Sequence, residues 1–509
     1  MKIKYIWLLA CIIVFSACNK REDFEMIEEE VQLPPATPGS ADFSNFVALG
    51  NSLMAGFTDG ALFIAGQNNS LPNILSQQFE VAGGGSFIQP LTNDNLGGLA
   101  LAGNRLPGFD PRFIFDGAGP APLESVIGPV TVTTDIVLNN PTGPFNNLGV
   151  PGAKSFHLLA PGYGNLGNLA LGLANPYFIR MTGSNPDASV LQLAATQTPS
   201  FFSLWIGNND VLGYALSGGD GTDPITPVDG PPGVGFNQTF GALIASLTAS
   251  GAGGVVANIP NVLEIPHFTT VPHNPVPLDA ATAAAVNQEY VPYNGGIQAA
   301  LAALEGTGLF TAEEAAARII SFEASETNAV VIEDESLTDL GAINPAFAGL
   351  PKIRQATADD LLVLLAANFI GTLADPNNPL SVNGVAIPLA DKWVLIPAEQ
   401  AEISEAITNF NGAISSAVSA AGLALVDANS LYNQLLAGGI TSGNFTLTSN
   451  LVTGGAFSLD GVHLTARGNA LVANEFMKAI DATYGSNFEA SGNLVDIGNY
   501  PTNYSPTLQ

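Results

Sequence analysis

The chain has few cysteines, few histidines and few positively charged residues. Its 509 residues include 2 cysteines, 4 histidines, and 14 lysines and arginines against 44 aspartates and glutamates, which gives a net charge of −30. The scarcity of cysteine excludes a fold held together by several disulfides. The strongly negative charge argues against nucleic acid as a partner and against electrostatic docking to anionic lipids.

Motifs for metals and cofactors are also missing. No pair of histidines has a ligand spacing such as His-Glu-x-x-His, and no P-loop or Gly-x-Gly-x-x-Gly stands between a strand and a helix. The acidic stretch 220–223 is more typical of a solvated surface turn than of a calcium loop. We therefore expect no metal site and no cofactor.

Apolar residues, in contrast, are abundant. They make up 47% of the chain while charged residues make up 11%, so a large core is easily formed. The 55 glycines and 35 prolines favour long ordered loops. We expect one domain over residues 41–484, followed by an extended tail over 485–509. Three stretches have the composition of insertions in that domain, at about 83–140, 218–235 and 268–397.

The first 17 residues have the pattern of an export signal. Lys2 and Lys4 precede an apolar stretch that is too short to span a bilayer. That stretch ends in Phe15-Ser16-Ala17-Cys18, which resembles a bacterial lipobox and implies cleavage before Cys18 and its acylation. A plain secretory signal peptide is the alternative.

Residues 18–40, rich in glutamate and proline, are expected to form a flexible acidic tether. We therefore expect an exported protein that is held by a lipid anchor, in the outer membrane or on the cell surface of a bacterium.

A serine follows a predicted buried strand near the start of the domain. The apolar run 46–49 leads through Gly50 and Asn51 to Ser52. In an open α/β sheet, ligands bind where the strands end, because the loops diverge there. A serine at this place also commonly caps the next helix, so Ser52 alone does not identify a nucleophile.

Three further segments place polar residues after apolar runs. They are the turn Gly149–Ala153, the cluster Gly207-Asn208-Asn209-Asp210, and Asp460-Gly461-Val462-His463 near the C-terminus. Each segment by itself is equally typical of an ordinary turn.

Taken in this order, the four segments resemble the sequence blocks of the SGNH (GDSL-type) hydrolase family. The resemblance implies that Ser52 is the nucleophile, that His463 is its base and that Asp460 orients the histidine. It also implies an oxyanion hole made by the backbone N–H groups of Ser52 and Gly152 and by the side-chain amide of Asn209.

Three later stretches are also similar to elements of the family: Val255–Asn261, a strand that ends in an Asn-x-Pro turn, the strand Leu423–Asp427, and the helical stretch Glu402–Ala421. The implied fold is a flavodoxin-like three-layer α/β sandwich with a central parallel sheet. The chain departs from the family at Asn51, where an aspartate is usual. This difference removes a negative charge beside the nucleophile.

The chemistry of ester cleavage agrees with this choice of base. A serine hydroxyl needs a neighbouring base, and histidine is suited to that role near neutral pH. His463 has a carboxylate, Asp460, three residues before it. His157 lies in an apolar setting typical of a core or of the wall of a site. His267 and His273 fall in the proline-rich stretch 265–277, which we expect to be a loop.

The insertion 268–397 is predicted to contain several elements of its own. We expect helices over 280–305 and 311–325, a strand over 329–332 and an apolar helix over 358–369. The last of these would be either a core helix of a subdomain or a lid over a pocket. Beyond the insertion, a final amphipathic helix is expected to begin at Thr465.

These observations predict an exported, lipid-anchored serine esterase or lipase that acts on a small-molecule or lipid ester. The apolar loops favour an acyl or lipid ester over a sugar acetate. Two alternatives remain open: a non-catalytic surface lipoprotein that binds a lipid or glycan, and an acyltransferase that uses the same residues.

Overall fold

The computed structural model describes residues 33–509, of which 36–509 form one compact unit. The expected signal peptide, Cys18 and most of the expected tether lie outside the described residues. Near the end of that tether, the backbone N–H of Thr37 donates to Asn487 Oδ1 (2.7 Å) and that of Ser40 to the Tyr484 carbonyl (2.8 Å). The folded unit therefore begins before residue 41.

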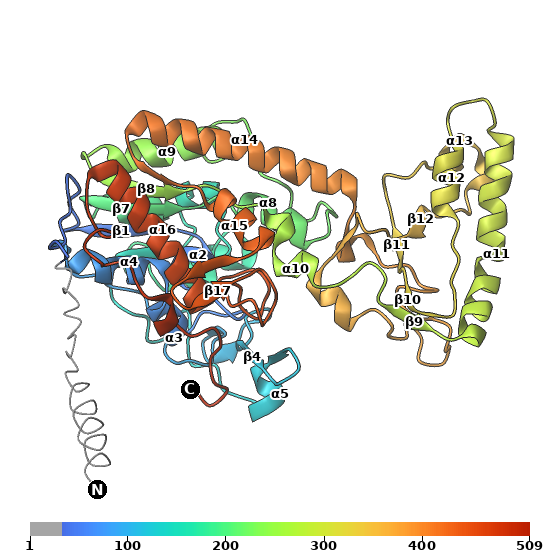
Figure 1. Cartoon of the computed structure of the whole chain (residues 1–509), viewed down its shortest axis with the longest axis horizontal. Coiled ribbons are helices and arrows are strands. Elements are labelled where there is room, and N and C mark those ends of the chain that lie inside the picture. Colours follow the sequence, from blue (N-terminus) through green and yellow to red (C-terminus); the bar gives the residue numbers. More distant parts are fainter. Residues whose placement is uncertain (1–32) are drawn as a thin grey trace, which may run out of the picture. The chain divides into compact units, whose positions relative to one another are not determined.

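A five-stranded parallel sheet forms the centre of the unit (Figure 1). Its strands, in spatial order, are β15 (Ala424–Val426), β8 (Gly253–Ala257), β7 (Phe201–Trp205), β1 (Phe46–Gly50) and β6 (Asn147–Gly149). In β1 and β7 every residue is buried, as expected for central strands that are covered on both faces. The register places Phe46 opposite Phe201 and Leu49 opposite Leu204.

Helices cover both faces of this sheet (Figure 1). One face carries α4 (Leu71–Glu80) and α16 (Ala466–Tyr484), and the other carries α7 (Val190–Ala195), α9 (Phe236–Thr248) and α14 (Pro397–Ala421). The result is a three-layer α/β sandwich. The predicted final helix is confirmed: Thr465 caps α16 by accepting from the Gly468 N–H.

The order of the strands creates a crevice next to β1. The chain leaves β1 for the edge strand β6 and then crosses back to β7 on the other side of β1. At such a switch point the loops after the two central strands separate, and ligands bind between them. Ser52 follows β1, and Asn208 and Asn209 follow β7.

The insertion 268–397 has a hydrophobic core of its own, which includes Val286, Ile297, Val331 and Leu389. The predicted first helix is confirmed, whereas the second ends earlier than predicted, at Arg318. The elements of this segment and its approach are α10 (Pro266–Thr269), β9 (Val276–Leu278), α11 (Ala280–Ala303), α12 (Ala312–Arg318), β10 (Ser325–Asn328), β11 (Val331–Glu333), α13 (Leu340–Ile343), β12 (Ile353–Gln355), β13 (Leu361–Leu362), η5 (Leu364–Asn368), η6 (Asp391–Trp393) and β14 (Val394–Leu395).

The apolar helix predicted over 358–369 is wrong. Leu361 and Leu362 form β13, which pairs antiparallel with β14, and a short 3-10 helix, η5, follows. A short run of leucine and valine suits a strand as well as a helix, so the pairing partner decides the outcome. Leu362, Val363 and Ala366 are buried in the two hydrophobic cores, which makes this segment a structural part of the fold.

Shorter elements complete the described part of the chain. They are α2 (Ser52–Ala55), α3 (Ile64–Asn68), β2 (Ala100–Leu101), β3 (Asn104–Arg105), β4 (Phe113–Phe115), β5 (Pro120–Pro122), α5 (Leu123–Ile127), η1 (Ser155–Leu159), η2 (Leu166–Leu171), α6 (Pro176–Ile179), α8 (Asn209–Leu216), η3 (Val262–Glu264), η4 (Pro345–Phe347), α15 (Ala428–Ala437), β16 (Ile440–Ser442), β17 (Phe445–Leu447) and η7 (Ile497–Asn499). Within residues 33–509 we find no helix with the length and apolar character needed to cross a bilayer.

Candidate active site

Ser52 is the first residue of α2, immediately after the central strand β1. The turn between the two elements depends on Gly50, because a Cβ there would lie 2.3 Å from the Trp205 carbonyl oxygen. Asn51 caps α2: its Oδ1 accepts from the Leu53 N–H at 3.0 Å. The serine is thereby fixed at the base of the crevice.

Asn51 also holds the neighbouring loop. Its Nδ2 donates to Asn208 Oδ1 at 3.1 Å, and both side chains are buried. An aspartate at position 51 could cap the helix but could not donate this second hydrogen bond. The asparagine at position 51 therefore has a structural consequence that the sequence did not predict.

Asp460 and His463 form a hydrogen-bonded pair. His463 Nδ1 lies 2.9 Å from Asp460 Oδ2, and the N–H groups of Val462 and His463 donate to Asp460 Oδ1. Burial alone would raise the pKa of Asp460, but the His463 charge and these hydrogen bonds outweigh it and hold the pKa below its ordinary value. A charged Asp460 that accepts from Nδ1 leaves Nε2 as the ring's free nitrogen.

A turn close to Ser52 supports this pair. The Gly60 N–H donates to Asp460 Oδ2 at 2.8 Å, and the Leu459 N–H donates to Asp59 Oδ1 at 3.0 Å. Asp59 is 1% exposed, and burial raises its pKa to about 7. The segment after α2 and the loop before α16 are thus joined by several hydrogen bonds.

The three groups expected to form an oxyanion hole have N–H bonds available. Neither the Ser52 N–H nor the Gly152 N–H donates to another group within residues 33–509. Asn209 Nδ2 donates one of its two hydrogens to the Ala153 carbonyl (2.9 Å), and the other hydrogen is available. Gly152 has φ +78°, a conformation that favours glycine.

Asp210 connects the segments that carry Gly152 and Asn209. It is fully buried and accepts from the Ser155 N–H (2.8 Å) and the Ser155 hydroxyl (2.6 Å). Burial raises the pKa of Asp210 to about 6 in spite of these hydrogen bonds. The start of α8, which carries Asn209, is in this way fixed to the turn that carries Gly152.

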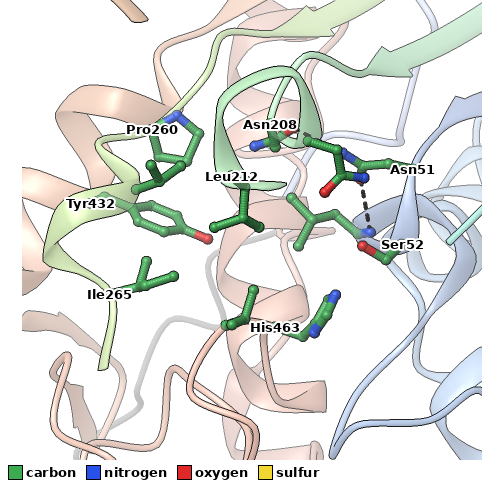
Figure 2. A pocket seen from close by; sticks show the side chains of 12 residues that line it. Asn51, Ser52, Asn208, Leu212, Pro260, Ile265, Tyr432 and His463 are labelled. Atoms are coloured by element: carbon green, nitrogen blue, oxygen red, sulfur yellow. Dashed lines mark hydrogen bonds between the residues drawn. The ribbon is translucent and has the colours of Figure 1, made fainter. Parts of the chain in front are cut away.

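Ser52 and His463 border the same small cavity (Figure 2). Its volume is about 30 Å³, enough for very few water molecules. Asn51, Asn208 and Asn209 contribute polar atoms. The rest of the wall is largely apolar and comes from the segments after β1, β7, β8 and β15 and before α16: Leu53, Leu212, Pro260, Val262, Ile265, Tyr432 and Val462.

No hydrogen bond joins Ser52 Oγ to His463 within the described residues. Such contacts are often long without substrate and tighten when it binds. Gly152 is not among the residues that line the cavity, although the turn carrying it is fixed to Asn209.

The other histidines are placed differently. His157 stacks on Tyr163 and its Nδ1 accepts from the Lys154 N–H, while burial lowers its pKa to about 4. His267 lies in the short helix α10, not in the predicted loop, because Pro266 starts that helix. Burial lowers the pKa of His267 to about 4, and its backbone N–H donates to the Gly461 carbonyl. Neither ring lines the cavity.

Sequence reasoning missed Asp59, the pairing of Asn208 with Asn51, and Tyr432 in the cavity wall. Asp59 and Tyr432 stand in no recognisable motif. Asp210 did carry a signal, since it directly follows Asn209.

Comparison of the chain with family models, curated proteins and solved structures gives no match. Conclusions about function therefore rest on the residues and on their geometry.

Proposed function

We propose that this protein is a serine esterase of the SGNH type that cleaves carboxylic esters through an acyl-enzyme on Ser52. The observation that carries the proposal is that Ser52 and His463, which come from opposite ends of the folded unit, border one cavity, and that Asp460 is hydrogen-bonded to this histidine. A nucleophile, a base and a carboxylate that orients the base make up the arrangement that acyl transfer requires.

In this mechanism, His463 Nε2 takes the proton of the Ser52 hydroxyl as Oγ attacks the ester carbonyl. The N–H groups of Ser52, Gly152 and Asn209 would stabilise the negative oxygen that develops. The protonated histidine then gives its proton to the departing alcohol, which leaves the acyl group on Ser52. Water, activated by the same histidine, releases the carboxylic acid and restores the hydroxyl.

The fold supports the same proposal. Counted along the chain, the five strands have the order 2-1-3-4-5, which is the order of flavodoxin-like sheets. In sheets of this kind ligands bind at the switch point, and here Ser52, Asn208 and Asn209 border that place. We therefore assign the sandwich to the flavodoxin-like group, with the site in its usual position.

Turnover of p-nitrophenyl acetate by the purified chain tests the proposal. Ser52→Ala should reduce kcat by on the order of a million-fold, because the nucleophile is lost. Ser203, a buried serine of β7 outside the cavity, provides a matched Ser→Ala control that should keep the activity. Substantial turnover by Ser52→Ala would refute the assignment.

A non-catalytic binding protein is the second candidate, and the missing Ser52–His463 hydrogen bond is the observation that favours it. In that case the wild-type protein would not turn over esters but would still bind them. An acyltransferase would use the same residues and would be recognised by acylated products when competing alcohols are present.

The cavity indicates the class of ester. Its apolar walls suit an acyl group, and its small volume suits a short one. We further propose that the enzyme is exported and held by lipid on Cys18, a position outside the described residues.

A further inference from the structure

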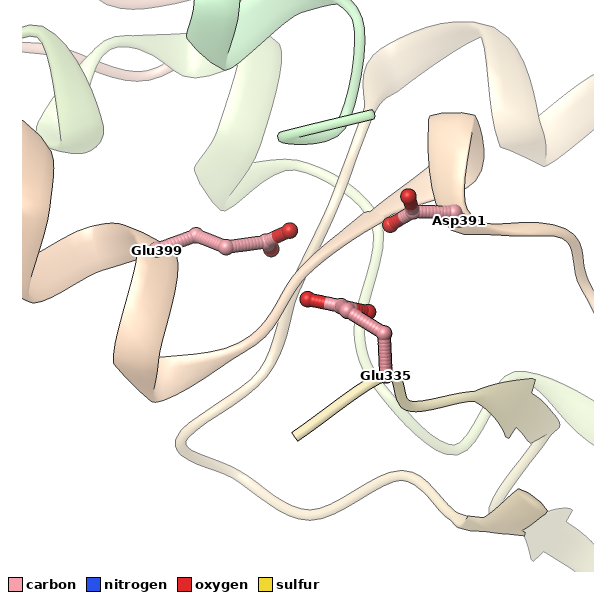
Figure 3. Close-up of side chains that lie close together, drawn as sticks. All are labelled: Glu335, Asp391 and Glu399. Atoms are coloured by element: carbon pink, nitrogen blue, oxygen red, sulfur yellow. The ribbon is translucent and has the colours of Figure 1, made fainter. Parts of the chain in front are cut away.

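Three carboxylates converge at a place away from the cavity (Figure 3). Glu335 follows β11, Asp391 begins η6, and Glu399 lies in the first turn of α14. One oxygen from each residue lies within 4.8 Å of the others. Such proximity is unfavourable for three negative charges unless something positive lies between them.

Glu399 is the most informative of the three. It is 4% exposed, and its Oε2 accepts from the Ile396 N–H at 2.8 Å. Its second oxygen, Oε1, is buried and has no hydrogen-bond partner. Oδ1 of Asp391 is likewise buried without a partner. A buried acceptor without a partner is costly, so both oxygens point to a missing ligand.

Within residues 33–509 no lysine or arginine forms an ion pair with any of the three carboxylates, although the Lys352 ammonium donates to the backbone carbonyl of Glu335. Lys392 follows Asp391 directly, but its ammonium lies over the Trp393 ring, 5.0 Å from the centroid, and forms no ion pair within residues 33–509. Further carboxylates stand nearby, among them Asp220 and Glu333. These carboxylates add to the negative charge around the cluster.

The loop before α9 closes one side of the cluster. A Cβ on Gly219 would lie 2.0 Å from Glu399 Oε1, so the glycine backbone approaches this oxygen closely. On another side, Glu335 is exposed and leaves access to water. The cluster is thus enclosed by backbone and open to solvent at one carboxylate.

We propose that Glu335, Asp391 and Glu399 bind a divalent cation, Ca²⁺ in the first place. Three carboxylates are hard oxygen ligands, which excludes the soft metals. Ca²⁺ accepts several carboxylates in flexible geometry, with water filling the remaining positions, whereas Mg²⁺ usually takes only one or two. The bound ion would link the 268–397 insertion to the first turn of α14.

Terbium luminescence on the chelator-treated full chain in detergent tests this site. Trp393 shares η6 with Asp391, so excitation of tryptophan should sensitise a Tb³⁺ ion bound by the cluster. We expect sensitised emission that Ca²⁺ displaces, together with a rise in Tm when Ca²⁺ is added.

Glu399→Gln is the decisive variant. Glutamine retains the acceptor for the Ile396 N–H, so α14 keeps its cap, but the charge needed by the cation is lost. We expect loss of both the displaceable emission and the Ca²⁺-dependent rise in Tm. Glu405→Gln, an exposed glutamate on the same helix, is the matched control and should behave like the wild type.

Two results would overturn the proposal. One is unchanged Ca²⁺ binding in Glu399→Gln. The other is a combination of two observations: the wild type shows no displaceable emission, and Glu399→Gln has a higher Tm than the wild type in the absence of Ca²⁺. That second outcome would identify a proton shared between carboxyl groups as what stabilises the cluster.

Discussion

The His463 ring is hydrogen-bonded to Asp460 and packs against the Phe57 ring, with 4.7 Å between the centroids. Asp460 accepts from Nδ1 at 2.9 Å and is itself fixed by the N–H groups of Gly60, Val462 and His463. With the carboxylate charged, the proton sits on Nδ1, and Nε2 carries the lone pair that a base requires. In the proposed mechanism, proton transfer by His463 would depend on Asp460 for the orientation of the ring.

We expect His463→Ala to reduce kcat about as much as Ser52→Ala, and the double variant to be little worse, because the two residues act as one unit. Asp460→Asn should be milder, with a loss of about 10⁴-fold, since the imidazole remains but in the wrong tautomer. Steady-state kinetics on the four variants check this. A larger loss in His157→Ala than in His463→Ala would identify a different base.

Asn209 provides the second prediction at this scale. If its side chain donates to the oxyanion, Asn209→Ala should lower kcat by about 10²–10³-fold and leave KM nearly unchanged. The reason is that the hydrogen bond strengthens only as charge develops on the oxygen.

Asn208→Ala is the comparison for that measurement. It should reduce kcat less than Asn209→Ala but destabilise the protein by about 1–3 kcal/mol, because Asn51 Nδ2 loses its buried acceptor. Kinetics and denaturant unfolding of both variants separate the two effects. A larger kcat loss at Asn208 would show that this residue is the oxyanion donor.

The Val462 side chain is part of the apolar wall of the cavity and limits its size. It is half-buried, and its contribution to the Asp460 loop is a backbone N–H, which Val462→Ala retains. The smaller side chain should raise kcat/KM for a longer acyl ester relative to the acetyl ester, by roughly tenfold. A series of p-nitrophenyl esters measures the ratio, and an unchanged ratio would place the acyl group elsewhere.

At the scale of elements, the site depends on the contact between the turn 58–60 and the loop 458–463. Hydrogen bonds cross it in both directions: the Asp59 N–H donates to Ser458 Oγ, and the Leu459 N–H donates to Asp59 Oδ1. Because Asp59 is buried beside Asp460, its pKa rises to about 7. The same carboxyl that joins the two segments therefore makes their stability depend on pH.

The sign of that dependence follows from proton linkage. Below its ordinary pKa of 3.8, Asp59 is protonated in both the folded and the unfolded chain and contributes no difference. Between about pH 4 and pH 7, the unfolded chain releases a proton that the folded chain retains. The free energy of unfolding therefore falls as the pH rises from about 4 to about 7, and Asp59 causes no further change above that range.

Asp59→Asn removes this titration, and asparagine tolerates the positive φ of 52° found here. Relative to the wild type, the variant should therefore gain a few kcal/mol in the free energy of unfolding from pH 4 to pH 8. Denaturant unfolding at both pH values provides the measurement. A difference between the two proteins that does not change with pH would contradict the assignment.

At the scale of the whole molecule, the cavity is assembled from segments at the carboxyl ends of several strands. The loop after β1 brings Ser52, the loop after β7 brings the asparagines, and the segment before α16 brings His463. The 268–397 insertion contributes a separate core. Residues from almost the full length of the folded unit must therefore be in place before the site exists.

The cellular localisation is also a property of the whole chain. If Cys18 is acylated, Cys18→Ser should lose lipid attachment and move to the soluble fraction of the producing cell, because an acyl anchor is needed for stable membrane binding. Labelling with a fatty-acid probe measures the attachment. Label that persists in Cys18→Ser would rule out the lipobox interpretation.

Much of the central architecture could be predicted from the sequence. The strands at 46–50, 201–205 and 253–257 are local apolar runs, and the polar residues that follow them are adjacent in the chain. The same is true of Asp460 and His463, only three residues apart. These features could be predicted because each of them depends on a few neighbouring residues.

Other features were decided by tertiary structure alone. The segment 358–369 became a strand and a 3-10 helix because β14 was there to pair with it. Asn51 pairs with Asn208, and Glu399 lies close to Glu335, in each case across a long separation and with no common motif. In each case the arrangement depends on a contact between distant segments, which no local pattern in the sequence records.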